Sequence, residues 1–163
     1  MAAPIGGVGG KGGVEIVLRP PLSFIMRQSG AFRMRLLDFR KLWEAFGEIM
    51  GDIEREQFET EGHGEWPGLA ASTIERKGHS EILVDTGKLR DSLVNPAAAM
   101  QISARSMSYG TDVDYAGYHQ SGTPKMPQRQ VISDPFRVED RRRLETAMIG
   151  WIDEIAAETF GRI

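Results

Sequence analysis

Residues 37–59, LDFRKLWEAFGEIMGDIEREQFE, have the apolar spacing of one long amphipathic helix. Apolar side chains recur every three or four residues, which places them along one side of a helix. They are Phe39, Leu42, Trp43, Phe46, Ile49, Met50 and Ile53. Gly47 and Gly51 each cost such a helix about 1 kcal/mol relative to alanine. We therefore expect another backbone to pack closely against these glycines, or the helix to bend there.

A second long helix is predicted near the C-terminal end of the sequence. Asp134 suits the N-cap and Pro135 the first helical position, so together they mark its start. The apolar side of this helix consists of Val138, Leu144, Met148, Trp151, Ile152, Ile155 and Phe160. Its first turns are rich in arginine, namely Arg137, Arg141, Arg142 and Arg143. We expect these arginines to pair with acidic residues of an adjacent subunit, with phosphate contact as the alternative.

Between the two helices the apolar period changes from helical to alternating. Met100 and Ile102 alternate with polar residues, and Met107 and Tyr109 do so with the opposite parity, which predicts two strands joined by a turn or bulge near residues 105–106. Residues 131–132 predict a last short strand. Two long helices packed on a small antiparallel sheet make the predicted fold class α+β.

Shorter elements are predicted from residues that typically cap or end helices. Residues 70–77 favour a short helix that ends before Gly78. Asp85 or Thr86 is the expected cap of a helical turn that continues through Leu89 and Leu93. Residues 124–130 predict an irregular extended loop.

The first 13 residues predict a flexible arm, because residues 5–13 are dominated by glycine and offer little to bury. Val14, Ile16 and Leu18 then alternate as in a short edge strand, which the prolines at 20–21 end. The glycine spacing weakly resembles a dinucleotide fingerprint, but no strand precedes it, so no cofactor is expected. We expect residues 14–163 to form a single domain.

Composition excludes several classes of protein. The chain has 163 residues, of which 40% are hydrophobic and 26% charged, as expected for one folded domain. A net charge of -3 argues against tight binding to nucleic acid. The absence of cysteine excludes disulfides and thiolate chemistry. No apolar run reaches the roughly 18 residues of a membrane helix, so we expect a soluble, unsecreted protein with no membrane partner.

The sequence offers no recognisable catalytic or metal-binding arrangement. His63, His79 and His119 lack the spacing of zinc ligands, so we expect no metal site and no catalytic residue. An acidic stretch consists of Glu54, Glu56, Glu59, Glu61 and Glu65. Helical spacing predicts that these glutamates form a solvated face, which could repel phosphates if it lined a channel for DNA. The protein is therefore not expected to be an enzyme.

A series of motifs runs through the middle of the chain in a fixed order. They are Trp66-Pro67-Gly68-Leu69, Thr73, Leu83-Val84-Asp85-Thr86-Gly87-Lys88-Leu89-Arg90-Asp91-Ser92, Tyr109-Gly110-Thr111, Tyr115-Ala116, His119-Gln120, Gly122 and Pro127-Gln128-Arg129. In this order they resemble the phage virion morphogenesis, or tail-completion, family of Mu-like phages and prophages. The resemblance covers roughly residues 37–155 and includes both long helices. Single motifs of this kind occur in many unrelated domains, so the series carries the signal.

The resemblance implies an α+β head-tail joining subunit that forms a ring, commonly six-fold, at the junction of phage head and tail. Double-stranded DNA would pass through the lumen with transient, non-specific contact. The motif residues that the family implies as structural or interface positions are Trp66, Pro67, Thr86, Gly87, Leu89, Arg90, Tyr109, Gly110, Tyr115, His119, Gly122, Pro127 and Arg129. Glycines among them can supply backbone angles barred to other residues, and the Trp66 indole can anchor a loop through a carbonyl.

The expected function is that of a virion structural protein, assembled in the host cytoplasm and located at the head-tail interface. Its expected partners are copies of itself and the adjoining neck or connector and tail-tube or terminator proteins. The glycine-rich arm and the loop 121–130 are the expected contacts. The alternative is an assembly chaperone, a morphogenesis factor that is absent from the finished virion.

Overall fold

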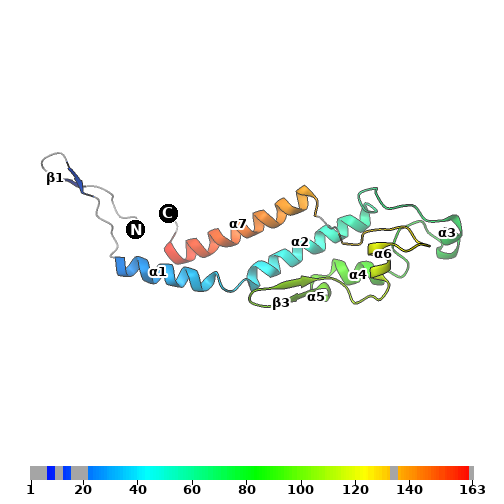
Figure 1. The fold of residues 1–163 in the computed structure, drawn as a ribbon, viewed down its shortest axis with the longest axis horizontal. Coiled ribbons are helices and arrows are strands. Elements are labelled where there is room, and N and C mark those ends of the chain that lie inside the picture. The colour runs from blue at the N-terminus through cyan, green and yellow to red at the C-terminus, as the bar shows by residue number, and fades with distance from the viewer. Residues whose placement is uncertain (1–6, 10–12, 16–21, 133–135, 162–163) are drawn as a thin grey trace. The chain divides into compact units, whose positions relative to one another are not determined.

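The computed structural model describes residues 7–9, 13–15, 22–132 and 136–161. Its backbone contacts divide the chain into two compact units. The first unit comprises Met1–Asp38 and Ile149–Ile163, and the second comprises Phe39–Met148. The elements of each unit are labelled in Figure 1, and we describe each unit by itself.

The first unit begins with an antiparallel hairpin of β1 (Gly7–Gly9) and β2 (Gly13–Glu15). Val8 lies opposite Val14 in this pair. The strand predicted at Val14 is therefore present, and its partner comes from the glycine-rich arm. The rest of that predicted strand, with Ile16, Leu18 and the two prolines, lies outside the described residues.

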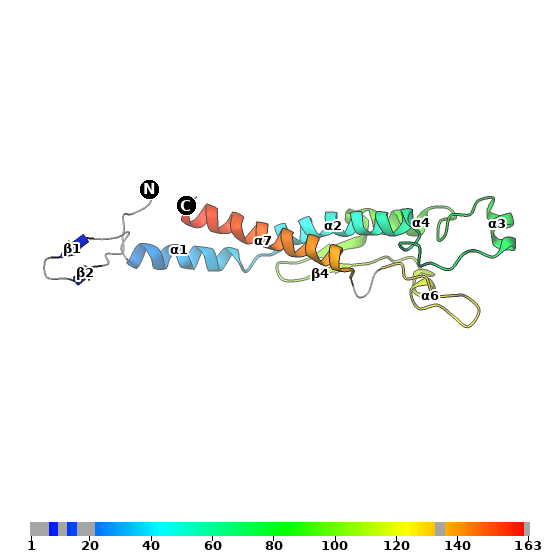
Figure 2. The same ribbon diagram turned by 90° about the horizontal axis from the view of Figure 1, so that it is seen from above.

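Helix α1 (Leu22–Arg35) follows, and the sequence pattern did not predict it. Its contacts are with the C-terminal end of α7, where the rings of Phe32 and Phe160 lie 5.3 Å apart between centroids and Arg35 pairs with Glu158. Figure 2 shows these ends of α1 and α7 side by side. The sequence of α1 is less amphipathic at helical spacing than that of α2, so periodicity gave no signal.

The second unit is built on α2 (Arg40–Glu59), which confirms the first predicted helix. Leu42, Met50 and Ile53 are buried along it. Helices α4 (Lys88–Val94) and α5 (Pro96–Ala99) pack against this side. A Cβ on Gly51 would lie 2.9 Å from the carbonyl oxygen of Val94, so the glycine permits the close approach of a neighbouring backbone, as predicted.

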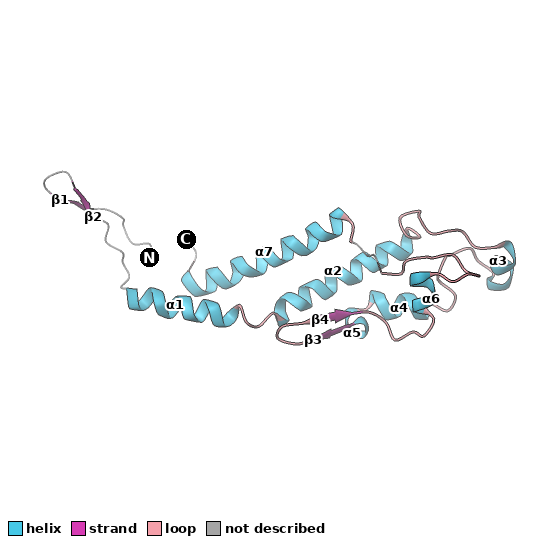
Figure 3. Ribbon diagram, viewed as in Figure 1, coloured by secondary structure: helices cyan, strands magenta, loops and turns pink. Residues whose placement is uncertain are grey.

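The predicted hairpin is present as β3 (Met100–Ile102) and β4 (Met107–Tyr109), coloured magenta in Figure 3. The strands are antiparallel, with Gln101 opposite Ser108. The turn between them is closed by the amide of Ser103, which donates to the carbonyl of Ser106 at 2.8 Å. Long helices with a small antiparallel sheet therefore confirm the predicted fold class.

The hydrophobic core of the second unit gathers residues from α2 and from the segments that follow it. It consists of Phe58, Trp66, Ile82, Leu89, Leu93, Val113 and Val131. Two short helices, α3 (Ala71–Lys77) and α6 (Ala116–Ser121), lie in the same unit. Helix α3 ends at Gly78, whose φ of 80° is left-handed, and this confirms the predicted helix and its end.

Two local predictions are wrong. Residues 131–132 form no strand, because the side chain of Gln120 takes the place of a strand partner: its Oε1 accepts from the amides of Val131 and Ile132 at 2.8 and 3.0 Å. The N-cap of α4 is Gly87 in a left-handed conformation, and neither Asp85 nor Thr86 caps the helix.

The second predicted long helix is α7 (Val138–Phe160). The proposed start at residues 134–135 lies outside the described residues. Trp151 and Ile155 are buried as expected, but Val138, Met148, Ile152 and Phe160 are exposed. Spacing identified the apolar side correctly but could not show how much of it is covered. Neither α7 nor any other described helix combines the length and apolarity needed to cross a lipid bilayer.

The arginines of α7 have different surroundings. Arg143 lies 3.5 Å from Asp52, 3.9 Å from Glu56 and 3.8 Å from Asp140, so it has acidic partners within its own chain. Arg137 contacts the ring of His63 and lies 3.9 Å from Glu139. The side chains of residues 141 and 142 are exposed, and their pairing with an adjacent subunit stays a prediction.

Candidate functional site

The motif residues all lie in the second unit, and several meet at the segment 128–132. Arg129 is only 6% exposed, and its guanidinium donates to the carbonyls of Pro67 at 2.7 Å and Gly68 at 2.9 Å. Its backbone amide donates to the carbonyl of His119 at 2.9 Å. Arg129 therefore joins three motifs that lie far apart in the sequence.

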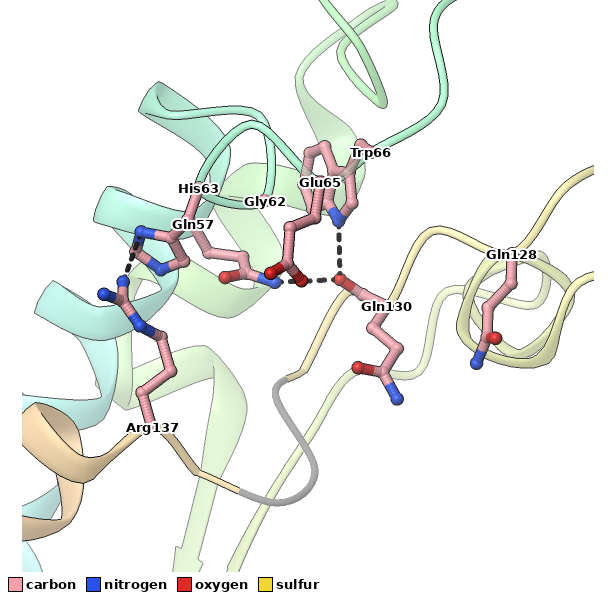
Figure 4. Close-up of a pocket in the computed structure, with 8 residues that line it drawn as sticks. All are labelled: Gln57, Gly62, His63, Glu65, Trp66, Gln128, Gln130 and Arg137. Atoms are coloured by element: carbon pink, nitrogen blue, oxygen red, sulfur yellow. Dashed lines mark hydrogen bonds between the residues drawn. The ribbon is translucent and has the colours of Figure 1, made fainter.

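The next residue, Gln130, is held by two further donors. The indole Nε1 of Trp66 and the amide Nε2 of Gln57 each lie 3.0 Å from its carbonyl oxygen, as Figure 4 shows. The Trp66 ring also meets Phe58 edge-on at 5.6 Å between centroids. This geometry confirms that the indole anchors a loop through a carbonyl, because the ring is buried in the core while its N–H is satisfied.

A hollow of about 510 Å³ opens beside these bonds. We call it the glutamine hollow, and it is lined by Gln57, Gly62, His63, Glu65, Trp66, Gln128, Gln130 and Arg137. In Figure 4 the guanidinium of Arg137 points at the His63 ring. The sequence gave no hint of this hollow, because its residues come from separate segments and share no motif.

One wall of the glutamine hollow is an unusual turn at the end of α2. Glu61, Gly62, His63 and Gly64 all have left-handed φ angles, between 50° and 80°. Such angles cost about 1–2 kcal/mol for each residue other than glycine. The turn is held by the amide of Gly62, which donates to the Gln57 carbonyl at 2.8 Å, and by Glu61, whose Oε1 accepts from the amide of Ile82.

The Thr-Gly-Lys-Leu-Arg motif forms the start of α4. Gly87 has φ of 81°, which explains the need for glycine there. Leu89 is buried in the core. Thr86 and Arg90 are not part of that core. The Thr86 hydroxyl lies 3.5 Å from the amide of Lys88, and Arg90 pairs with Asp91 at 2.8 Å.

The Tyr-Gly motif follows β4. Tyr109 donates its hydroxyl to the carbonyl of Leu93 and so ties the hairpin to α4. Burial, and then the nearby carboxyl of Glu54, raise the pKa of Tyr109, which keeps the phenol protonated. The amide of Gly110 donates to the carbonyl of Ala99 at 2.9 Å. The φ angle of Gly110 is not left-handed, so the prediction of a backbone angle that only glycine adopts is wrong at this position.

The remaining motif residues lie at the N-cap of α6, on this helix and after it. The rings of Tyr115 and His119 meet edge-on at 6.1 Å between centroids. Burial, and then the charge of Arg129, lower the pKa of His119, which favours the neutral imidazole. Gly122 has φ of 71° and approaches the backbone of Gln128, whereas Pro127 is exposed.

A second hollow, of about 430 Å³, brings together six of the 13 motif positions. Those six are Thr86, Gly87, Leu89, Tyr115, His119 and Arg129. We call this hollow the basic pocket because Arg76, Lys77 and Lys88 also line it. The structure thus brings residues 86–89 next to residues 115–129, which sequence order alone does not show.

Glu54 contradicts the prediction that the acidic stretch is solvated. Its side chain is completely buried, and neither carboxyl oxygen has a hydrogen-bond partner among the described residues. Burial, and then the nearby carboxyl of Asp140, raise the pKa of Glu54 to about 8. Glu56, Glu59 and Glu65 are exposed as predicted. Glu54 follows Met50 at four residues and so falls on the buried side of α2, a signal that charge composition concealed.

Loss of the Arg129 guanidinium should destabilise the second unit. In Arg129→Met the carbonyls of Pro67 and Gly68 lose their donors, and we expect the free energy of unfolding to fall by about 2–3 kcal/mol. Chemical denaturation measures this change. Arg90→Met is the matched control, because Arg90 is partly exposed and pairs only with its neighbour, so its loss should cost less than about 0.5 kcal/mol. Equal losses in both variants would contradict the role of Arg129.

No protein-family model, no curated protein and no solved structure matches the chain. The resemblance to the tail-completion family therefore stays a prediction from the motifs.

Proposed function

We propose that the chain is a virion structural protein of a tailed phage, which forms a ring at the head-tail junction and completes the tail or neck. The observation that carries this proposal is the convergence of the motifs on one site. Trp66, His119 and Arg129 belong to different motifs, yet hydrogen bonds through the segment 128–132 hold them together. A series of motifs that shares one framework supports a common fold with the family that it resembles.

The proposed ring requires two different surface patches on each subunit, one for each neighbour. Exposed apolar side chains of α7 in the first unit suit one patch: Ile149 is 58% and Ile152 39% exposed. These residues follow one another at helical spacing, so they share one side of the helix. The exposed tip of the loop 121–130 suits another patch, since Thr123 and Lys125 are exposed there.

Charge supports a passage for DNA in the ring. Glu56, Glu59 and Glu65 are exposed, and the net charge of the chain is -3. Like charge lowers the attraction of passing phosphates and so permits transient contact without retention. In the proposed assembly these glutamates face the lumen.

Quantitative mass spectrometry of purified particles tests whether the protein belongs to the virion. We expect the protein in a copy number that corresponds to one ring, judged against the major tail-tube protein of the same sample. Absence from particles, with presence in the lysate that produced them, would contradict the proposal and support the assembly chaperone.

A further inference from the structure

The basic pocket holds a buried positive charge without a matching acid. Arg129 is 6% exposed, and its guanidinium donates hydrogen bonds to the neutral carbonyls of Pro67 and Gly68. Among the residues that the structure describes, no carboxylate lies within ion-pairing distance of Arg129. A buried guanidinium is normally balanced by an anion, because desolvation makes an isolated charge costly.

Two further cations, at the rim of the pocket, also lack an acidic partner. Arg76 on α3 and Lys88 at the start of α4 line the pocket and are exposed. In the described part of the chain neither of them pairs with a carboxylate. Asp85 is the single acidic residue in the lining, so the pocket carries a clear positive excess.

A buried polar atom of another lining residue also lacks a partner. The Nδ1 atom of His119 is buried and has no hydrogen-bond partner in the described residues. His119 lines the pocket beside Arg129. Burial and the Arg129 charge lower the pKa of His119, so the neutral ring can donate one hydrogen bond to an incoming oxygen. Arg129 and His119 thus form a pair of groups that one anionic ligand would satisfy.

The rest of the lining indicates what kind of anion fits. Leu69, Leu83 and the ring of Tyr115 supply apolar surface next to the cations. Tyr115 is 41% exposed, so its ring is available to a ligand. A volume of about 430 Å³ falls within the roughly 300–1,000 Å³ typical of ligand pockets. Inorganic phosphate would leave the apolar surface unused, and single-stranded nucleic acid requires a basic groove with several stacking rings.

We propose that the basic pocket binds an acidic peptide segment of a partner protein, with a carboxylate at Arg129 and His119 and aliphatic side chains against the leucines. Flanking acidic residues of the peptide meet Arg76 and Lys88 at the rim. This inference does not depend on the proposed ring: it adds the chemistry of one partner, and peptide binding is measured apart from ring formation.

Selection from a random hexapeptide library displayed on messenger RNA tests the pocket with the full-length chain. We expect enrichment of sequences that combine Asp or Glu with Leu, Ile or Phe. The enriched peptide, labelled with fluorescein, should bind more weakly in high salt, because much of its attraction is electrostatic. Enrichment of neutral or basic peptides, or no enrichment at all, would overturn the proposal.

Charge reversal locates the binding. The double variant Arg76→Glu and Lys88→Glu should weaken binding of the selected peptide about tenfold or more, since both positions would then repel its carboxylates. The double variant Arg105→Glu and Arg141→Glu is the matched control, because both arginines are exposed, lie outside the pocket and change the net charge equally. Equal weakening in both double variants would overturn the location.

Competition separates the peptide from other anions. Inorganic phosphate and a short single-stranded DNA should displace the selected peptide only at much higher concentration than the unlabelled peptide does. Displacement by DNA at similar concentration would assign the pocket to nucleic acid and overturn the proposal. Thermal unfolding midpoints equal to that of the unmodified chain show that the exposed variants remain folded, so weaker binding reports on contact.

Discussion

Glu54→Gln should remove a loss of stability that the unmodified protein suffers as the pH rises from about 5 to about 8. Burial raises the pKa of Glu54 to about 8 in the folded chain, against the ordinary value of 4.5 that applies when the chain unfolds. Between these values the unfolded chain releases a proton that the folded chain retains, so the free energy of unfolding falls with rising pH. Each pH unit costs about 1.4 kcal/mol, which sums to on the order of 4 kcal/mol.

Above about pH 8 both states are ionised, and this contribution becomes constant. Glutamine keeps the shape of the side chain without the titration, so the variant should be the more stable protein at pH 8. Urea denaturation at several pH values measures the difference. Glu59→Gln is the control, because Glu59 is exposed on the same helix and should leave the pH profile unchanged. A profile of Glu54→Gln that follows the unmodified protein would contradict the burial of a protonated Glu54.

Gly62→Ala should destabilise the second unit by about 2–5 kcal/mol. A Cβ at this position would overlap the Cδ1 and Nε1 atoms of Trp66, which are held by the core and by the bond to Gln130. Overpacking of a rigid site costs about 1–3 kcal/mol or more, and the left-handed φ of 69° adds about 1–2 kcal/mol for alanine. The free energy of unfolding from chemical denaturation measures the sum.

Gly64→Ala separates the two causes. Gly64 has φ of 80° in the same turn, but a Cβ there would meet nothing within 4 Å. This variant should therefore cost only the backbone contribution of about 1–2 kcal/mol. If both alanine variants lost the same stability, contact with Trp66 would not be the reason that glycine is needed at position 62.

The sequence predicted those elements whose signal is local. Residues 37–59 carry a strong three-and-four pattern, and Gly51 correctly indicated the close approach of another backbone. Helix α1 escaped prediction because the contacts described for it are with α7, more than 100 residues away. Residues 131–132 have the apolar character of a strand, but Gln120 supplies the hydrogen bonds, and no local pattern encodes such a side-chain partner.

The candidate site was predicted only as a set of motif residues. The motifs correctly included Arg129 and Trp66, but their partners are carbonyl groups, which every residue has and no sequence pattern reveals. Charge rules placed Glu54 in solvent, because an unpaired buried carboxyl is rare. Its position on the apolar side of α2 outweighed that rule, and the protonated form that burial favours reduces the cost.

Cryo-electron microscopy of the head-tail junction in purified particles tests the central proposal most directly. We predict density for this fold repeated around a closed ring between head and tail, with the exposed residues of α7 near a neighbouring copy and the glutamates at positions 56, 59 and 65 toward the lumen. A junction that contains no copy of this chain, in particles that are fully assembled, would contradict the account.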